Sequence, residues 1–404
     1  MGERLTAEDA RILALERGNV RGHTCKLLIV DGAHGVEDVR REVGARIGCE
    51  PRLRRRLVEE PLSLVDDDDF RVENHVRDGG GATEVELRAL LAKVMAERLD
   101  RDRPLWAMDV IALDGLRTAL AWRIHHAIAD GTVAMRMARG LLFQGPAPEA
   151  PARRPATSPQ ATVRPGTIRR ELAHRAKRSA LDRPAGPRRE MAYVEAELAQ
   201  VKAIAHGAAE RATVNDVVLA AVAGGLRRWL GEAGAEHAAM RVKVPVSLHT
   251  SDEDDGANRD SFMCVDLPLA GPDAAARLAA VTQETRERKT DHDAQSLAAF
   301  FADVSHLSRS LERYAEHWAM SPRVFTLNVS NVPGPAEPQQ VLGSPLLHLY
   351  SFAEIAHHHA LRIAVVSAGG RIAFGLCADA DAVPGVDVIA SGIEEEIGEL
   401  SAAL

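Results

Sequence analysis

The stretch RIHHAIADGTV, residues 123–133, places two adjacent histidines ahead of an Asp-Gly pair. Before it, Leu120, Trp122 and Ile124 alternate with other residues as in a strand. After it, VAMRMARGLLF (133–143) is apolar at helical spacing, and Asp130 or Thr132 can cap the free N–H groups of that helix. We therefore expect His125, His126 and Asp130 to lie in a turn between a strand and a helix, where catalytic side chains are often displayed.

The surrounding patterns predict an α/β chain. Asp114-Gly115 joins two strand-like runs within residues 106–124, and this dipeptide is a strong hairpin signal. CKLLIVDG (25–32) reads as a strand, followed by a helix over 35–48, and residues 214–234 read as a long helix. Further strands are expected at 240–248, 261–269, 324–332 and 361–379, the last span forming a hairpin about Gly369-Gly370, before a C-terminal helix.

Composition narrows the class of protein. The 404 residues are 46% hydrophobic, enough for a large core in two lobes or domains. A net charge of -8 argues against nucleic acid as a partner, and four widely separated cysteines argue against a disulfide framework or a zinc ribbon. The charged N-terminus lacks the apolar core of a signal peptide, and no apolar run is long enough to span a membrane. The sequence thus predicts a cytoplasmic protein, with peripheral membrane or lipid-droplet contact left open.

A Pro- and Ala-rich stretch divides the chain. Residues 145–167 have the composition of a linker, so we expect an N-terminal lobe over 1–145, a linker with a basic segment over 146–187, and a C-terminal lobe over 188–404. The basic segment spaces Ile168, Leu172, Ala176 and Leu181 roughly as a helix does. Such a helix can meet a lipid surface, bind the phosphates of a substrate, or lie solvated beside the linker. Its basic side chains are Arg169, Arg170, Arg175, Lys177, Arg178 and Arg183.

The paired histidines also have simpler interpretations. Adjacent histidines can merely end a strand, and an Asp-Gly pair before a helix is often only a cap. A metal site is disfavoured, because consecutive strand residues point to opposite faces and His125 and His126 cannot easily converge on one ion. The run His357-His358-His359 meets the same objection and reads as a loop or strand end. Histidines and aspartate together, however, form HHxxxDG, which is far more specific than either part.

HHAIADG (125–131) resembles the HHxxxDG motif of acyl-CoA-dependent acyltransferases that share the chloramphenicol acetyltransferase fold, including the condensation domains of peptide synthetases. The neighbouring blocks resemble, in the same order, those of the bacterial wax ester synthase/diacylglycerol acyltransferase family, and the similarity runs along the whole chain. These blocks are LDRDRPLWAMDVI (99–111), LDRPAGPRR (181–189), TVNDVVLAAVAGGLRRWL (213–230), VPVSL (244–248), NVSNVPGP (328–335) and GRIAFGLCADADAVPG (370–385). The short Arg-rich region before Arg188 departs from the family pattern.

The resemblance implies a fold and an activity. The expected fold has two lobes of mixed sheet and helix that meet at a central channel. The expected reaction moves a fatty acyl group from acyl-CoA, a co-substrate, to a hydrophobic acceptor, a long-chain alcohol or diacylglycerol. No metal and no bound cofactor are expected, and the oligomeric state is left open. CoA phosphates would be held by scattered arginines, since the sequence has no P-loop or Rossmann fingerprint.

The resemblance also assigns roles to residues. His126 would be the general base, a task that suits an imidazole at neutral pH, and His125 would be architectural. Asp130 would hold the loop, most simply by an ion pair with an arginine, and Gly131 would let the backbone turn closely. Ser330 and Asn331 are candidate oxyanion donors that can equally be turn residues. Asn215 and Asp216, the family's ND motif, can equally be a helix cap and first-turn acid, and Pro104, Leu105 and Trp106 would shape lobe packing.

Three functions remain in competition at this point. The first is synthesis of wax esters or triacylglycerol by direct transfer, since no GxSxG elbow that would support an acyl-enzyme occurs. The second keeps the base and fold but acts on a secondary-metabolite acceptor such as a polyketide, sugar or amine. The third is a non-catalytic protein that binds acyl-CoA or lipid, against which the intact HHxxxDG argues.

Overall fold

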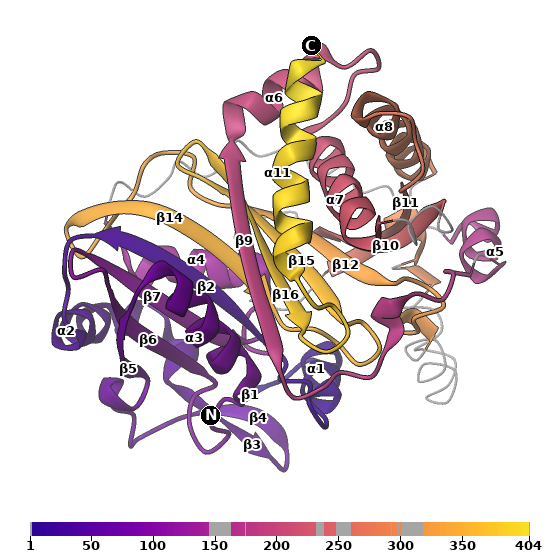
Figure 1. Ribbon diagram of the computed structural model, residues 1–404. Coiled ribbons are helices and arrows are strands. Elements are labelled where there is room, and N and C mark those ends of the chain that lie inside the picture. The colour runs from indigo at the N-terminus through magenta and orange to yellow at the C-terminus, as the bar shows by residue number, and fades with distance from the viewer. Residues whose placement is uncertain are drawn as a thin grey trace.

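The computed structural model describes residues 2–144, 163–173, 175–231, 238–247, 260–291, 293–297, 299–300 and 318–403. Most of the linker predicted over residues 145–167 lies outside these ranges. The described chain builds two large mixed sheets, each with helices packed on it, and a small third sheet (Figure 1). The prediction of a two-lobed α/β fold is confirmed.

A seven-stranded sheet forms the core of the first lobe, in the order β5-β6-β7-β2-β14-β13-β8. The predicted hairpin is present: Asp114 and Gly115 both have positive φ and join β6 to β7. The strands are β2 (His23–Asp31), β5 (Val76–Ala82), β6 (Trp106–Leu113), β7 (Arg117–His125), β8 (Phe143–Gln144), β13 (Gln340–Val341) and β14 (Ser344–Ala353). The helices of this lobe are α1 (Ala7–Leu15), α2 (Val36–Arg46), α3 (Glu84–Ala96) and α4 (Gly131–Leu141). A small sheet contains β1 (Glu3–Arg4), β3 (Arg55–Glu59) and β4 (Leu62–Asp66).

The second lobe is a six-stranded sheet in the order β11-β10-β12-β15-β16-β9, with α7 and α11 crossing one face (Figure 1). The predicted hairpin about Gly369-Gly370 joins β15 to β16, and both glycines have positive φ. The strands are β9 (Arg189–Glu197), β10 (Ala239–Ser247), β11 (Asp260–Pro268), β12 (Leu327–Pro333), β15 (Leu361–Ala368) and β16 (Arg371–Asp379). The helices are α6 (Leu198–Gly207), α7 (Val214–Leu230), α8 (Ala274–Thr290) and α11 (Val386–Ala402).

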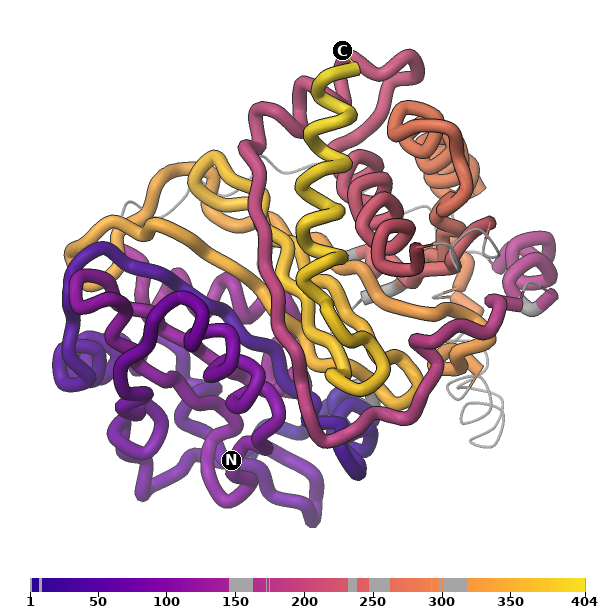
Figure 2. The backbone as a smooth tube through the Cα atoms, viewed as in Figure 1, coloured from indigo at the N-terminus to yellow at the C-terminus, as the bar shows by residue number. Residues whose placement is uncertain are grey.

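β14 connects the two lobes. It comes late in the chain but pairs with β2, so a segment from the second half completes the sheet of the first (Figure 2). The two sheets are in close contact at Gly375 of β16, where an added Cβ would collide with the carbonyl oxygen of Ser351 in β14. The other face of the six-stranded sheet, which includes Val366 and Ala373, packs into the core of the first lobe. The chain beyond residue 188 therefore contributes to both sheets.

The basic segment differs from the predicted helix. α5 (Pro165–Ala173) ends early, and the chain from residue 175 to 179 is not helical. The backbone N–H of Ala176 donates to the Arg323 carbonyl at 2.7 Å, which removes it from a helical ladder. Arg170 is also not a solvated cation, because its guanidinium binds Asp291 at 2.7 Å and Asp293 at 2.6 Å. Local periodicity could not reveal either tertiary contact.

Candidate active site

The HHxxxDG residues form the connection between β7 and α4, as predicted. We call residues 125–131 the motif loop. The backbone N–H of His126 donates to the Gly22 carbonyl at 2.8 Å, which ties the motif loop to the residue just before β2. Asp130 is the N-cap of α4, and its Oδ1 accepts from the Val133 N–H at 2.7 Å. The motif loop is thus fixed at both ends by backbone groups.

The segment Pro104-Leu105-Trp106 holds the end of β7. The Leu105 carbonyl accepts the backbone N–H of His125 at 3.0 Å, and Trp106 pairs with Ile124 across the β6–β7 hairpin. The Trp106 indole N–H donates to the Leu53 carbonyl at 2.8 Å. These contacts belong to the first lobe, so in this structure the segment supports the strand that carries the histidines.

His125 lies in a closed environment. His125 is 1% exposed, and its Nδ1 accepts a hydrogen bond from the Ala127 N–H at 3.2 Å. Its Nε2 lies 3.9 Å from Oε2 of Glu16. The pKa of His125 is lowered to about 3, chiefly by burial and also by the neighbouring His126 and Arg101. A neutral, enclosed ring of this kind suits the architectural role implied for His125.

His126 lies beside it but is only partly buried. Its Nδ1 is shielded from solvent. A hydrogen bond between the ring and the residue's own backbone raises the pKa. The pKa of His126 is lowered to about 4, chiefly by burial and then by the Arg362 cation, while the Asp130 carboxylate opposes this shift. The imidazole is therefore neutral near pH 7 and available to accept a proton.

Two cations near the motif loop were not found by sequence reasoning. Lys26, on β2, is 1% exposed and donates to the Ser351 hydroxyl at 2.7 Å. Burial lowers the pKa of Lys26 to about 8, and the Asp130 carboxylate opposes that shift. The arginine expected to pair with Asp130 stays a prediction, and Lys26 is a further cation whose charge interacts with this carboxylate. The second cation, Arg362, is the second residue of β15, and strand periodicity gave no sign of its approach to the motif loop.

β12 forms the opposite wall of the site. Leu327 and Val329 belong to the core beneath α7, so Ser330 and Val332, by strand alternation, lie on the other face. A Cβ at Gly131 would lie 3.0 Å from Cγ2 of Val332, so this face meets the start of α4 and Gly131 permits the close approach. Ser330 thus shares the β12 face that meets the motif loop.

The other predicted residues lie behind this wall. Asn331 points to the opposite face of β12, and its Nδ2 donates to Oδ1 of Asn215 on α7 at 3.5 Å. Asp216 accepts from the Thr213 N–H at 2.8 Å and from the Thr285 hydroxyl at 2.7 Å. The N-cap of α7 is Thr213, and Asp216 is its first-turn acid. These contacts let Asn215 and Asp216 fix α7 against β12 and α8.

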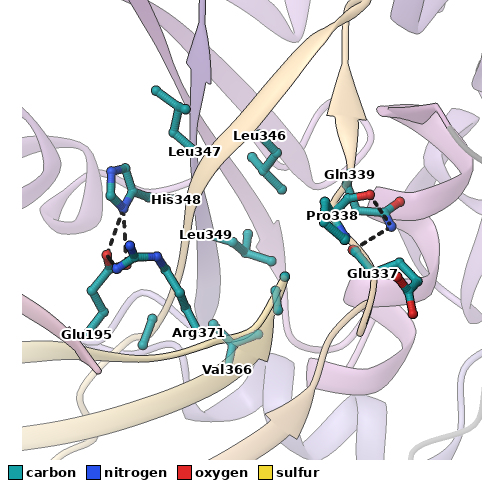
Figure 3. Close-up of a pocket in the computed structure, with 13 residues that line it drawn as sticks. Glu195, Glu337, Pro338, Gln339, Leu346, Leu347, His348, Leu349, Val366 and Arg371 are labelled. Atoms are coloured by element: carbon teal, nitrogen blue, oxygen red, sulfur yellow. Dashed lines mark hydrogen bonds and ion pairs between the residues drawn. The ribbon is translucent and has the colours of Figure 1, made fainter. Parts of the chain in front are cut away.

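A separate small cavity of about 70 Å³ lies between β14, the β9–β16 pair and residues 337–339 (Figure 3). His348 and Arg371 converge on the Glu195 carboxylate at its side, with 3.0 Å between His348 Nδ1 and Glu195 Oε1. Leu346, Leu349 and Val366 form much of the remaining wall. None of the residues predicted for the active site lines this cavity, which leaves the motif loop as the candidate reaction centre.

A two-sheet fold with HHxxxDG at the junction of its sheets defines the class of acyl-CoA-dependent acyltransferases with the chloramphenicol acetyltransferase-like fold. Two family models match within this chain: the wax ester synthase/diacylglycerol acyltransferase catalytic domain over residues 5–176, and the C-terminal domain of the same proteins over 257–401. The chain belongs to the wax ester synthase/diacylglycerol acyltransferase family.

Individual relatives agree with this assignment. A Mycobacterium tuberculosis protein named as a diacylglycerol O-acyltransferase is 28% identical over 98% of this chain and 90% of its own length. A second protein of that species with the same named activity is 29% identical, over 87% of this chain and 85% of its own. The chain is therefore assigned as an acyltransferase with a long-chain alcohol or diacylglycerol as acceptor.

Solved structures show the same fold. The wax ester synthase/diacylglycerol acyltransferase of Marinobacter aquaeolei VT8 superposes with a TM-score of 0.72 at 23% identity, covering 99% of both chains. A starter condensation domain of rhizomide synthetase, solved in complex with C8-CoA, superposes with a TM-score of 0.60 at 13% identity, over 100% of this chain and 94% of that one. Among the described residues, no helix is both long and apolar enough to cross a membrane.

Proposed function

We propose that this acyltransferase works by direct transfer, with His126 as the general base. The position of His126 carries the proposal: it is a partly exposed neutral imidazole on a fixed loop, and the end of that loop, Gly131, meets the β12 face that also carries Ser330. The acyl donor is acyl-CoA, in keeping with the C8-CoA complex of the related condensation domain. The acceptor is the hydroxyl of a long-chain alcohol or of diacylglycerol, as the relatives' names indicate.

An alcohol hydroxyl is a weak nucleophile near neutral pH, whereas a thioester carbonyl carbon is readily attacked, so the reaction mainly requires removal of the hydroxyl proton. His126 takes the hydroxyl proton as the alcohol oxygen attacks the thioester carbonyl carbon. The carbonyl oxygen becomes an oxyanion, to which the Ser330 hydroxyl donates. The intermediate collapses by breaking the C–S bond, and the imidazolium returns its proton to the thiolate. One ester and one free CoA thiol result.

A covalent acyl-enzyme is less well supported. Burial raises the pKa of Cys25 and of Cys264 to about 12, and it also raises the pKa of Cys377 above its usual range. A thiol is a nucleophile only as the thiolate, so these buried cysteines are poor candidates near neutral pH. Direct transfer between two bound substrates needs no such group.

The test is release of free thiol from acyl-CoA in the presence of a long-chain alcohol or diacylglycerol. We expect His126→Ala to lower kcat/KM by about a hundredfold to ten-thousandfold, the usual contribution of a positioned general base. The control is His206→Ala, which removes an exposed histidine on α6. Wild-type turnover by a folded His126→Ala protein would exclude this base, and no turnover by the unaltered protein would favour a binding role.

We also propose that the basic segment meets an anionic lipid surface. Arg169, Arg175 and Lys177 are exposed. An open hollow beside Arg169 is lined mainly by apolar residues, among them Pro165, Ile168 and Phe300. Cationic side chains next to an apolar hollow are the combination that favours the membrane interface.

A further inference from the structure

A short 3-10 helix, η2 (Pro51–Arg54), is attached to the elements on both sides of the motif loop. Glu50, the residue before η2, binds Arg136 of α4 at 2.9 Å, on the side where the loop ends. The Leu53 carbonyl accepts the indole N–H of Trp106, which pairs with the strand that carries the histidines. Glu50 and η2 therefore brace the strand before the motif loop and the helix after it.

Arg52 of η2 contacts the motif loop itself. Its Nη1 donates to the Ile128 carbonyl at 2.8 Å. Ile128 is buried and lies midway between His126 and Asp130 in the sequence. A backbone carbonyl in a buried turn needs a hydrogen-bond partner, and a charged donor forms a stronger bond than a neutral one. The Arg52 guanidinium therefore fixes the middle of the loop, between the proposed base and the carboxylate that acts on it.

The Arg52 guanidinium is in turn held by the N-terminal segment. Its Nη2 lies 3.3 Å from Oε1 of Glu3 and 3.7 Å from Oδ2 of Asp9. The buried Asp9 carboxylate also accepts the backbone N–H of Thr6 at 3.2 Å, in the cap of α1. The Arg52 side chain is only 13% exposed, so these charge interactions are screened less than those at the surface. One side chain thus links the motif loop to α1 and to the small sheet.

We propose that Arg52 is a positioning residue for acyl transfer: it holds the motif loop where His126 reaches the hydroxyl of the acceptor. The proposal rests on His126 as the general base proposed above. Arg52 acts through the backbone of the loop and takes no part in the bond changes of the reaction.

The effect of Arg52 on the base is one of position. The largest effects of charge on the pKa of His126 come from Arg362 and Asp130. A general base must lie within hydrogen-bond reach of the proton that it accepts, and a misplacement of about 1 Å lowers a rate by up to about 100-fold. Loss of the guanidinium leaves the Ile128 carbonyl without its charged donor, so the loop no longer keeps His126 at that distance. Binding of the substrates does not depend on that distance.

The experiment measures kcat, KM and melting temperature in two variants of Arg52. Release of thiol from acyl-CoA, with a saturating long-chain alcohol, gives both kinetic constants. We expect Arg52→Met to lower kcat by about 10- to 100-fold and to leave KM for acyl-CoA within about twofold of wild type. Arg52→Lys should keep a melting temperature near wild type, because its ammonium still pairs with the two carboxylates. Its kcat should lie between those of wild type and Arg52→Met, because a point charge replaces the planar fork.

The matched control is Arg55→Met, at the first residue of β3. The Arg55 guanidinium binds Glu3 at 2.7 Å and Asp66 at 3.0 Å, both in the small sheet. Arg55 thus shares Glu3 with Arg52, and its two partners belong to the small sheet and not to the motif loop. We expect Arg55→Met to lower the melting temperature about as much as Arg52→Met and to keep the wild-type kcat. Rates are compared at a temperature below every melting transition, so that they report on folded protein.

A wild-type kcat in folded Arg52→Met overturns the proposal, whether or not KM changes. An equal fall of kcat in Arg55→Met also overturns it, because the effect would then be a general loss of stability. Should Arg52→Met not fold, Arg52→Lys decides the question: a lowered kcat at an unchanged melting temperature supports the proposal, and a wild-type kcat overturns it. Absence of thiol release by the unaltered protein would instead overturn the proposed function.

Discussion

His23, His125 and His126 form a group of neutral histidines at one end of the seven-stranded sheet. Burial is the largest cause of the lowered pKa of each histidine, and the resulting pKa is about 3 for His125 and about 4 for His126. An unfolded histidine binds its proton near pH 6.5. Between about pH 6.5 and about pH 4 the unfolded chain therefore holds more protons than the folded one, and stability falls as pH is lowered through that window.

The substitution His23→Leu tests this pH dependence. His23 is 1% exposed, and neither ring nitrogen has a hydrogen-bond partner among the described residues. Each such histidine contributes a slope of up to about 1.4 kcal/mol per pH unit. We expect the loss in free energy of unfolding between about pH 7 and about pH 5 to be smaller in His23→Leu than in wild type. Urea denaturation at both pH values measures it, with His206→Leu, at an exposed position, as control.

Gly22 allows a second test at the residue scale. It has φ of +68°, and a Cβ there would lie 2.7 Å from Nε2 of His125. Gly18, with φ of +57°, has nothing within 4 Å of the same added atom. Both alanine substitutions cost about 1 kcal/mol for the left-handed backbone, but only Gly22→Ala also displaces His125. We expect it to lower both the melting temperature and kcat/KM well below the values for Gly18→Ala; equal effects would show that contact with His125 contributes nothing.

At the scale of elements, the residue that caps α4, Asp130, affects both the stability of the helix and the charge around the proposed base. Asp130 caps the helix and also places a negative charge near Lys26 and His126. Asparagine is about as good an N-cap as aspartate, whereas alanine is poor. The substitutions Asp130→Asn and Asp130→Ala therefore separate the two contributions.

We expect Asp130→Ala to lose about 1 kcal/mol more stability than Asp130→Asn, the usual contribution of a cap. Both should lower kcat, because both remove the charge that raises the pKa of His126. Thermal melts and initial rates of thiol release measure the two effects. Identical melting temperatures for the two variants would mean that the cap does not stabilise α4, and wild-type rates would mean that the charge does not act on the base.

The sequence predicts those elements whose ends are fixed by neighbouring residues, such as turn glycines and helix caps. Asp114-Gly115 and Gly369-Gly370 supply the positive φ that their hairpins need, and Asp130 supplies a cap, so the sequence places all three correctly. The end of α5 and the approach of Lys26 and Arg362 to the motif loop depend on segments distant in the chain. Likewise, strand alternation separates Ser330 from Asn331 only once the core beneath α7 is known. Sequence periodicity contains none of that information.

At the scale of the whole molecule, α5 is anchored to the second lobe by ion pairs, which are buried at Glu171 and partly exposed at Arg170. Glu171 accepts from Arg241 and from Arg288, each at 2.6 Å, and Arg170 binds Asp293 at 2.6 Å. The inward side of α5 is therefore fixed, which leaves Arg169 and the following Arg175 and Lys177 exposed. Because this surface is already rigid, its charges can contact a membrane without the loss of conformational entropy that ordering a flexible segment would require.

This arrangement predicts that reversing three charges releases the protein from anionic vesicles. Each basic side chain near an anionic surface contributes about 1 kcal/mol. The triple variant Arg169→Glu, Arg175→Glu, Lys177→Glu should thus lower the vesicle partition coefficient by about 100-fold or more. Arg170 is left in place, because its loss would disturb the ion pairs that hold α5.

The matched control carries the same change in net charge at exposed positions elsewhere: Lys202→Glu, Arg211→Glu, Arg227→Glu. Flotation with vesicles that contain anionic lipid should separate the two triple variants, and high salt should weaken wild-type binding. Turnover of a short, dispersed alcohol should stay near wild type in both, since the motif loop is untouched. If the two variants float alike, the segment is not the docking surface; if KM for acyl-CoA rises only in the first, its cations bind CoA phosphates instead.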